Sequence, residues 1–160
     1  MRAVAVDLDA LGDTRPLWRD FVVDAARRFG SIAPLDPDAL PPDRAEAAAE
    51  LDRWAEAGVG DWRVALRRFA EDRAPVYLRP NAEANAALRA LTAGKVRIGV
   101  YTDAPEALAL VALAHLGAER RVDALETGAG ARERLVDRLG GSGVAVAATL
   151  EDLTTITVDG

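Results

Sequence analysis

The stretch MRAVAVDLDALGDT, residues 1–14, decides the fold of this 160-residue chain. Ala3 to Val6 is a short apolar run with valine at alternate positions, which is typical of a buried strand. The run ends in Asp7-Leu8-Asp9, and side chains two residues apart on a strand point the same way. Open α/β sheets bind ligands at the carboxyl ends of their strands, so Asp7 and Asp9 are candidate site residues. The alternative is an acidic strand exit with no chemistry.

Composition excludes several kinds of protein. The 20 basic and 26 acidic residues leave a net charge of −6, which argues against a general nucleic-acid binder. The chain has no cysteine, so thiolate metal sites and a cysteine nucleophile are excluded. Its single histidine, His115, excludes a multi-histidine metal centre, and we expect this residue to be structural. The sequence has no apolar run long enough for a membrane span and begins with no signal sequence, so we expect a cytoplasmic protein that does not bind membranes.

Residues 15–74 are expected to be entirely helical. Helices are predicted from Pro16 to Gly30, from Asp43 to Ala57 and from Asp61 to Asp72, and the segment 31–42 between the first two carries four prolines. This part holds all the tryptophans and phenylalanines of the chain. We interpret the spacing of Trp18, Trp54, Trp62 and Phe69 as internal packing rather than a ligand site.

The rest of the chain alternates helix and strand, which predicts right-handed crossovers and a parallel sheet. The expected strands, besides the first, are Val96–Tyr101, Val122–Leu125, Val144–Ala148 and Thr155–Val158, the last of them at an edge. The expected helices are Asn81–Leu91, Pro105–Leu116 and Ala129–Leu139.

Four stretches in this order resemble the haloacid dehalogenase (HAD) superfamily, and more closely its phosphoglycolate phosphatase-like branch: VAVDLDALGDT, VRIGVYTDAPEAL, AHLGAERRVDALET and VAVAATLEDL. The resemblance covers nearly the whole chain. It implies an α/β fold: a Rossmann-like core with a parallel sheet, formed by residues 1–14 and 75–160, and an inserted small helical cap, residues 15–74. The strand of Asp7 should then lie centrally, between Val96–Tyr101 and Val144–Ala148. The cap should pack over the carboxyl ends of the strands, with Trp62 and Phe69 buried.

The resemblance also implies roles for individual residues. Asp7 matches the nucleophile that forms an aspartyl-phosphate, and Asp9 matches the general acid and base. Thr102 matches the hydroxyl that binds the transferring phosphoryl group, although a threonine at a strand end also caps a following helix. Asp103 and Arg132 are the further phosphate-binding candidates. The implied cofactor is Mg²⁺, with Asp7, Asp9 and Asp152 as candidate ligands. We expect Asp7, Asp9 and Asp152 to converge near Thr102.

The sequence also departs from the family pattern at three positions. Ala10 follows Asp9 where the family has a glycine. The lysine that neutralises nucleophile and phosphate should fall in residues 125–132, LETGAGAR, but the only lysine of the chain is Lys95. Arg132 is the nearby cation, and its forked head is not a simple lysine substitute. The first aspartate of the metal motif is Ala148.

These departures favour an impaired family member. Losing one electrostatic donor costs roughly 10²–10³ in rate, and altering even an indirect metal partner costs roughly 10–100-fold. One reading is therefore a binding or regulatory module for a phosphorylated metabolite or a protein partner, with at most weak Mg²⁺ binding. The alternative is a weak Mg²⁺-dependent phosphomonoesterase in which Glu151, Asp152 or Arg132 fill the gaps. Dehalogenation ranks third, because it also depends on the missing lysine.

Overall fold

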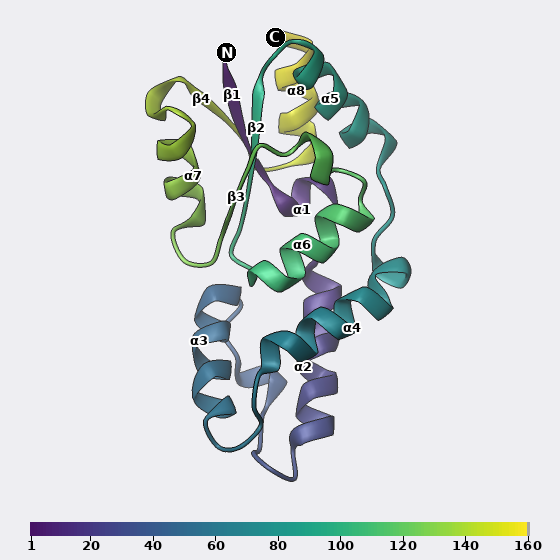
Figure 1. Cartoon of the computed structure of the whole chain (residues 1–160), viewed down its shortest axis with the longest axis vertical. Coiled ribbons are helices and arrows are strands. Elements are labelled where there is room, and N and C mark those ends of the chain that lie inside the picture. Colours follow the sequence, from purple (N-terminus) through teal and green to yellow (C-terminus); the bar gives the residue numbers. More distant parts are fainter. Residues whose placement is uncertain (160) are drawn as a thin grey trace.

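The computed structural model describes residues 1–159, which form a mixed α/β fold around one parallel sheet (Figure 1). The strands lie in the order β3-β2-β1-β4, with bounds β1 Ala3–Asp7, β2 Arg97–Thr102, β3 Ala124–Thr127 and β4 Val144–Ala147. The prediction of a parallel α/β sheet is confirmed, and so is the central position of β1 between β2 and β4.

The register brings the carboxyl ends of the strands to a common level. Asp7 at the end of β1 pairs with Tyr101 of β2, and Thr102 pairs with Thr127 of β3. Parallel strands all point the same way, so whatever follows each strand gathers at this one edge. The edge lies at the lower end of the sheet in Figure 1, towards α2, α3 and α4.

Alternate residues of β1 divide the core into two layers. Val4 and Val6 belong to the large cluster that also includes buried residues of α5 (Ala82–Ala93), α6 (Glu106–His115) and α8 (Leu150–Asp159). Ala3 and Ala5 belong to a smaller cluster with Leu135 of α7 (Ala131–Leu139). The two sets alternate along the strand because successive side chains point to opposite faces.

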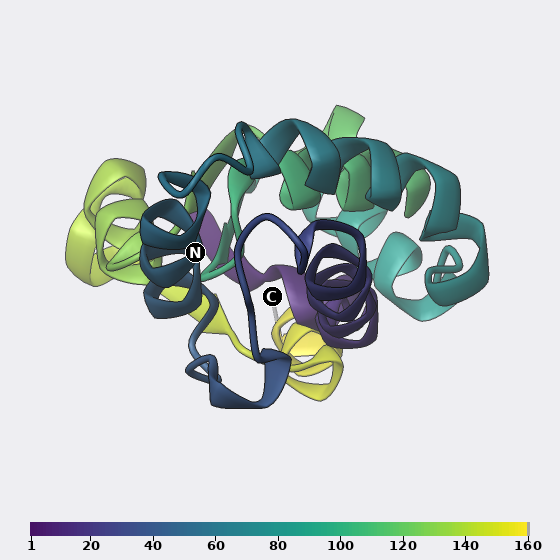
Figure 2. The same cartoon turned by 90° about the horizontal axis from the view of Figure 1, so that it is seen from below.

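The segment between β1 and α5 is helical throughout its regular elements. It comprises α1 (Leu8–Leu11), α2 (Arg15–Phe29), the short 3₁₀ turn η1 (Pro37–Ala39), α3 (Arg44–Ala55) and α4 (Trp62–Tyr77). Figure 2, seen from below, shows α2, α3 and α4 lying across the lower end of the molecule. Two further 3₁₀ turns, η2 (Glu119–Arg121) and η3 (Gly141–Gly143), precede β3 and β4. Helix α4 continues five residues past the expected end at Asp72, and Pro75 lies within its last turn.

Aromatic side chains pack α2 against α4. The ring of Trp62 lies 6.3 Å from that of Trp18 and 6.4 Å from that of Phe21, and Phe69 lies 5.8 Å from Phe21. Trp62 is 2 % exposed and Phe69 is half-buried. Neither ring is therefore exposed in the way that a ligand-binding or protein-binding surface would require. Trp54 packs separately, against Phe29.

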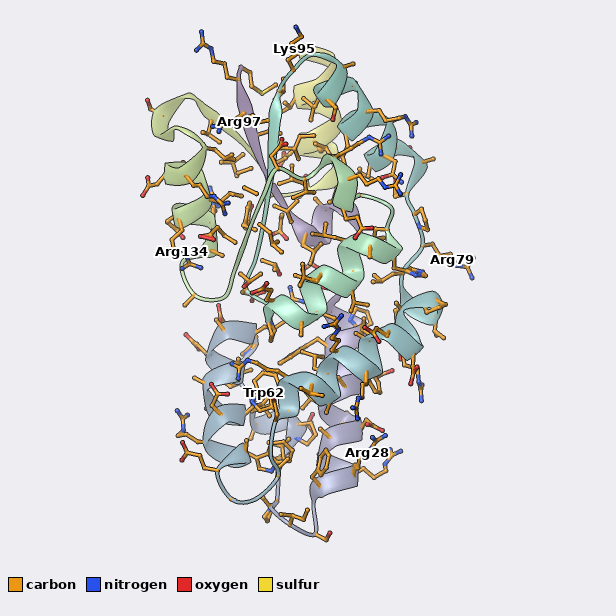
Figure 3. All side chains as sticks on the ribbon, viewed as in Figure 1. Arg28, Trp62, Arg79, Lys95, Arg97 and Arg134 are labelled. Carbon is orange, nitrogen blue, oxygen red and sulfur yellow. The ribbon has the colours of Figure 1, made fainter. Side chains whose placement is uncertain are left out.

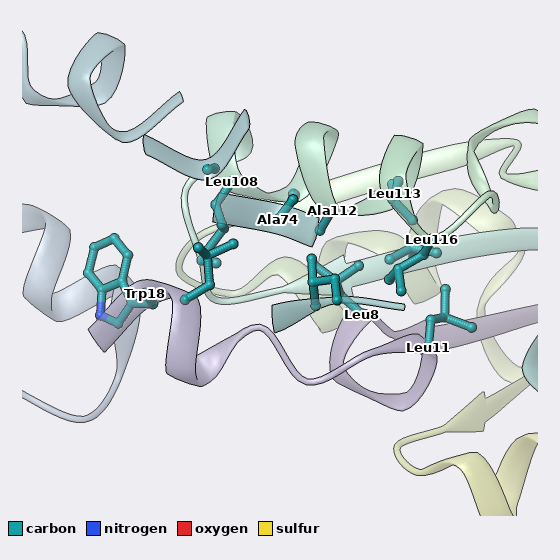
Figure 4. Close-up of a cluster of buried hydrophobic side chains, with 14 of the residues drawn as sticks. Leu8, Leu11, Trp18, Ala74, Leu108, Ala112, Leu113 and Leu116 are labelled. Carbon is teal, nitrogen blue, oxygen red and sulfur yellow. The ribbon is translucent and has the colours of Figure 1, made fainter. Parts of the chain in front are cut away.

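The core continues without a break from α1 to α6. Leu8 and Leu11 lie beside Leu113 and Leu116, and the same cluster extends past Leu108 to Trp18 (Figure 4). The helical segment and the sheet therefore share one apolar interior.

The prediction of a strand at Thr155–Val158 is wrong, because these residues belong to α8. The β-branched run favoured a strand, but propensity is a weak determinant beside packing. Leu150, Leu153 and Ile156 recur every three residues and join the large cluster, which is helical periodicity. No helix within residues 1–159 is long and apolar enough to cross a membrane.

Candidate active site

A pocket of about 340 Å³ opens where the strands end. Its lining comes from the ends of β1 and β2, the loop before α7 and the start of α3. The charged residues around it are Asp7, Asp9, Arg15, Asp43, Arg44, Asp103, Arg132 and Glu133. Five of these eight are acidic, so the pocket has an excess of negative charge.

Asp7 is the last residue of β1 and begins α1. Its Oδ1 accepts the backbone N–H of Asp9 at 2.9 Å, which caps the short helix. Burial raises the pKa of Asp7 above its ordinary value, and the neighbouring Asp9 carboxylate adds to this effect. Burial also raises the pKa of Tyr101, its register partner, with a further contribution from Asp7. The desolvation of Asp7 therefore outweighs the cations around it.

Asp9 is held by several donors. Its Oδ1 accepts the backbone N–H of Thr14 at 2.9 Å and the hydroxyl of the same threonine at 2.6 Å. Its Oδ2 accepts Nη2 of Arg44, also at 2.9 Å. The carboxylate is thus engaged on both oxygens by the protein itself.

Arg44 is the central side chain of the site, although it is not among the site residues expected from the sequence. It is the first residue of α3, is only 4 % exposed, and reaches across to the strand ends. Its Nε donates to Oδ1 of Asp103 at 2.8 Å, and its backbone N–H donates to Oδ2 of the same residue at 3.1 Å. Its Nη1 donates to Oγ1 of Thr14 at 2.6 Å.

One feature of the sequence concerns Arg44. A cation in the first turn of a helix opposes the helix dipole, whereas an anion there is favourable. Helix α3 begins DRAE after two prolines, so Arg44 breaks a local rule in a chain rich in acidic residues. Arg15, Arg63 and Arg132 also lie in the first turns of α2, α4 and α7, so this feature alone does not distinguish Arg44 from them.

Thr102 and Asp103 follow directly from β2. Thr102 is 2 % exposed, and its hydroxyl accepts the N–H of Ala104 at 3.2 Å and Nη2 of Arg44 at 3.4 Å. Thr102 therefore holds the turn after β2 and also faces the pocket, but it does not cap the following helix, since α6 has Pro105 at its N-cap and no side-chain cap. Asp103, a predicted phosphate-binding residue, pairs with Arg44.

The loop before α7 supplies the far wall. The N–H of Gly128 donates to the carbonyl of Thr102 at 2.9 Å, and Gly130 precedes the helix in the left-handed region, at φ 68°. Arg132 is exposed at the pocket, and Arg134 binds back to carbonyls of this loop. Lys95 lies at the opposite end of the sheet from Arg134 (Figure 3), so it cannot replace the lysine missing from residues 125–132.

Asp152 lies outside the pocket lining. Its Oδ2 accepts the N–H groups of Ala148 and Thr149 at 3.1 and 3.2 Å, and its own N–H donates to Oγ1 of Thr149 at 3.0 Å. This reciprocal pattern is a capping box at the start of α8. In the structure, one pocket is lined by Asp7, Asp9, Thr102, Asp103 and Arg132. Asp152 does not line it and caps α8 instead.

These residues do not fit a magnesium ion. Mg²⁺ takes octahedral oxygen ligands, commonly one or two carboxylates with waters and substrate phosphate. Asp9 is bound to Arg44, position 148 carries no ligand, and Asp152 caps a helix. Among residues 1–157, whose side chains the structure describes, no group of three or more aspartate, glutamate or histidine side chains is placed to hold a metal ion.

His115 lies away from these residues, half-buried in a groove of about 760 Å³ between α4 and α6. It is not among the residues that line the candidate site.

Comparisons with known proteins agree with the fold. A crystal structure described as a putative beta-phosphoglucomutase from Thermotoga maritima superposes with a TM-score of 0.55, over 99 % of this chain and 82 % of that one. The two sequences are 19 % identical, so the likeness shows the shared HAD-like fold alone. No protein family profile matches the sequence, and no curated protein sequence matches it either.

Proposed function

We propose that this chain is a HAD-fold protein with a phosphatase-type site that is catalytically impaired, and that it acts as a binding or regulatory module. The ligand would be a phosphorylated small molecule or a protein partner. The observation that carries the proposal is at the metal motif. Position 148 is an alanine and so supplies no carboxylate, and Oδ2 of Asp152 is engaged by the N–H groups of Ala148 and Thr149.

The size of the deficit supports the proposal. Loss of the lysine costs roughly 10²–10³ in rate, and loss of a metal carboxylate costs roughly 10–100-fold or more. From a median turnover of ~10 s⁻¹, independent losses leave about 10⁻³ s⁻¹ or less. Catalytic effects of groups that act together often fail to add, so this figure is an order of magnitude.

A second candidate, a weak Mg²⁺-dependent phosphomonoesterase acting through Asp7, is favoured by one specific observation. Asp7 and Thr102 lie at the ends of adjacent strands, and Arg44 brings a positive charge to the same pocket. A cation beside the nucleophile could replace part of the missing lysine's charge, although the guanidinium is already paired with carboxylates.

A phosphatase assay on the purified protein separates the two. A panel of phosphate esters is incubated with the wild type and with Asp7→Asn, each with and without magnesium. The binding-module proposal expects no turnover that depends on Asp7. Magnesium-dependent turnover that Asp7→Asn abolishes would overturn it in favour of the weak enzyme.

A gain-of-function series tests why activity is absent. Ala148→Asp restores the motif carboxylate, and a lysine is then added at Ala129 or Arg132, which are exposed and line the pocket. If the site has only lost its charges, the combined variants should hydrolyse esters faster than Ala148→Asp alone. Adding Asp7→Asn should remove that gain.

A further inference from the structure

The arginine at the centre of the pocket makes four side-chain hydrogen bonds with its five N–H donors. Asp9, Thr14, Thr102 and Asp103 together accept its Nε, Nη1 and Nη2. The side chain of Arg44 is 5 % exposed, against 21 % for Asp9 and 37 % for Asp103. A buried guanidinium is stable only when its charge and its donors are compensated, and here two carboxylates compensate it.

The geometry is specific to arginine. The planar fork of a guanidinium can bind several carboxylate and hydroxyl oxygens at once, in fixed directions. In this site one edge of the fork meets Asp103 and the other edge meets Asp9 and Thr14. A lysine at position 44 would carry the same charge on a single point and could not reach all of these oxygens.

We propose that Arg44 is the resident cation of this site and takes the place that a bound metal would hold. The guanidinium pairs with Asp9 and Asp103, and it excludes divalent metal ions from both carboxylates. The inference rests on the proposed function only in that the pocket is the site; it makes its own prediction about metal binding.

Electrostatics gives the reason for exclusion. Two like charges a few ångströms apart inside a protein repel strongly, and a divalent ion doubles the repulsion that a monovalent one feels. A metal ion bound to Asp9 would lie close to a guanidinium nitrogen that is itself 2.9 Å from that carboxylate. Metal binding therefore requires Arg44 to leave.

Displacing Arg44 would also loosen α3. The arginine begins α3, whereas Asp9 and Asp103 follow β1 and β2, so each ion pair joins the helical segment to the strand ends. The backbone N–H of Arg44 also binds Asp103, so the start of the helix is held together with its side chain. The start of α3 is thus held to the strand ends while the guanidinium stays in place.

Binding of Mn²⁺, followed by electron paramagnetic resonance and calorimetry, tests the proposal. Arg44→Gln should bind Mn²⁺ at the pocket at least about tenfold more tightly than the wild type, a change of the size that partners of metal ligands produce. Arg44→Lys keeps the charge, so it should gain much less. Asp9→Asn combined with Arg44→Gln should lose the gain, because it removes the carboxylate that the arginine releases.

Chemical rescue keeps the test independent of small changes in folding. Added ethylguanidinium should displace Mn²⁺ from Arg44→Ala. The control Arg19→Ala, whose arginine is exposed and pairs with Asp38, keeps Arg44 and should bind Mn²⁺ no more tightly than the wild type. Equal Mn²⁺ affinity of wild type and Arg44→Gln would overturn the proposal, as would a gain that survives Asp9→Asn. None of these outcomes depends on phosphatase activity, so the resident-cation proposal and the proposed function can fail separately.

Discussion

The hydroxyl of Thr14 lies between Arg44 and Asp9, accepting Nη1 of the arginine at 2.6 Å and donating to Oδ1 of the aspartate at 2.6 Å. It thereby links the cation and the carboxylate on the side opposite their direct contact. Thr14 is fully buried, so water cannot replace either bond.

Replacing this hydroxyl should destabilise the protein. Thr14→Val keeps the shape of the side chain but removes both hydrogen bonds, leaving an Nη1 donor and a carboxylate lone pair without this partner. We expect a loss of about 1–3 kcal/mol in the free energy of unfolding. Urea denaturation measures it, with the exposed Thr155→Val as the matched control. Equal stability of the two variants would show that the hydroxyl link carries no energy.

Much of the fold could be predicted from the sequence because its signals are local. The apolar run of β1 and the alternation of helices and strands fixed a parallel sheet, and the parallel sheet then placed the ends of β1 and β2 side by side. Asp7 and Thr102 are adjacent for this reason alone. The likeness to a solved structure of the same fold agrees with that part of the prediction.

The ion pairs of the site could not be predicted in the same way. Arg44 meets Asp9 and Asp103 across 35 and 59 residues of chain, and no local pattern encodes such a contact. Asp152 fits both a metal motif and a capping box, because an acidic residue three positions after Thr149 satisfies either pattern. The sequence alone therefore cannot distinguish a metal ligand from a helix cap here. The capping box also explains why α8 replaces the expected strand, since it begins a helix at the required residue.

The capping role of Asp152 leads to a second prediction. Asp152→Ala should lower the free energy of unfolding by about 0.5–2 kcal/mol, because the N–H groups of Ala148 and Thr149 lose their acceptor. It should leave Mn²⁺ affinity unchanged in the Arg44→Gln background. Glu151→Ala, an exposed acidic neighbour in the same turn, serves as the control. A large fall in metal affinity on Asp152→Ala would instead make this residue a ligand.

Gly99 provides a third prediction, about the layer between β2 and α7. A Cβ atom at this position would lie 2.6 Å from Cδ1 of Leu135 and 2.8 Å from Cδ1 of Leu139. Gly99→Ala should therefore overpack this layer and cost about 1–3 kcal/mol. Gly143→Ala is the control, since a Cβ there meets nothing within 4 Å. Thermal unfolding of both variants checks the difference, and an unchanged melting temperature for Gly99→Ala would mean that α7 shifts at no cost.

The last prediction concerns the pH dependence that Asp7 imposes on stability. Burial raises the pKa of Asp7 above the ordinary 3.8, so between these two values the folded protein holds a proton that the unfolded chain has released. The unfolded state then binds fewer protons, and stability falls as pH rises through this window. Asp7→Asn removes the penalty. It should unfold at a higher temperature than the wild type at neutral pH, and its advantage should shrink as pH falls through the raised pKa towards 3.8.

Asp13→Asn gives the opposite sign and so serves as the control. The hydrogen-bonded Arg15 lowers the pKa of Asp13, which makes its ionised form stabilising in the folded state. This pair is exposed and screened by solvent, so its contribution to stability is small. Asp13→Asn should be slightly less stable than the wild type at neutral pH, with the difference lost as pH falls below 3.8 through the lowered pKa. Subtracting the wild-type curve from each variant's curve isolates these effects from the other carboxylates. If Asp7→Asn proved less stable than the wild type at neutral pH, the ionised Asp7 would be a stabilising partner of Arg44, and the charge balance described for the pocket would be wrong.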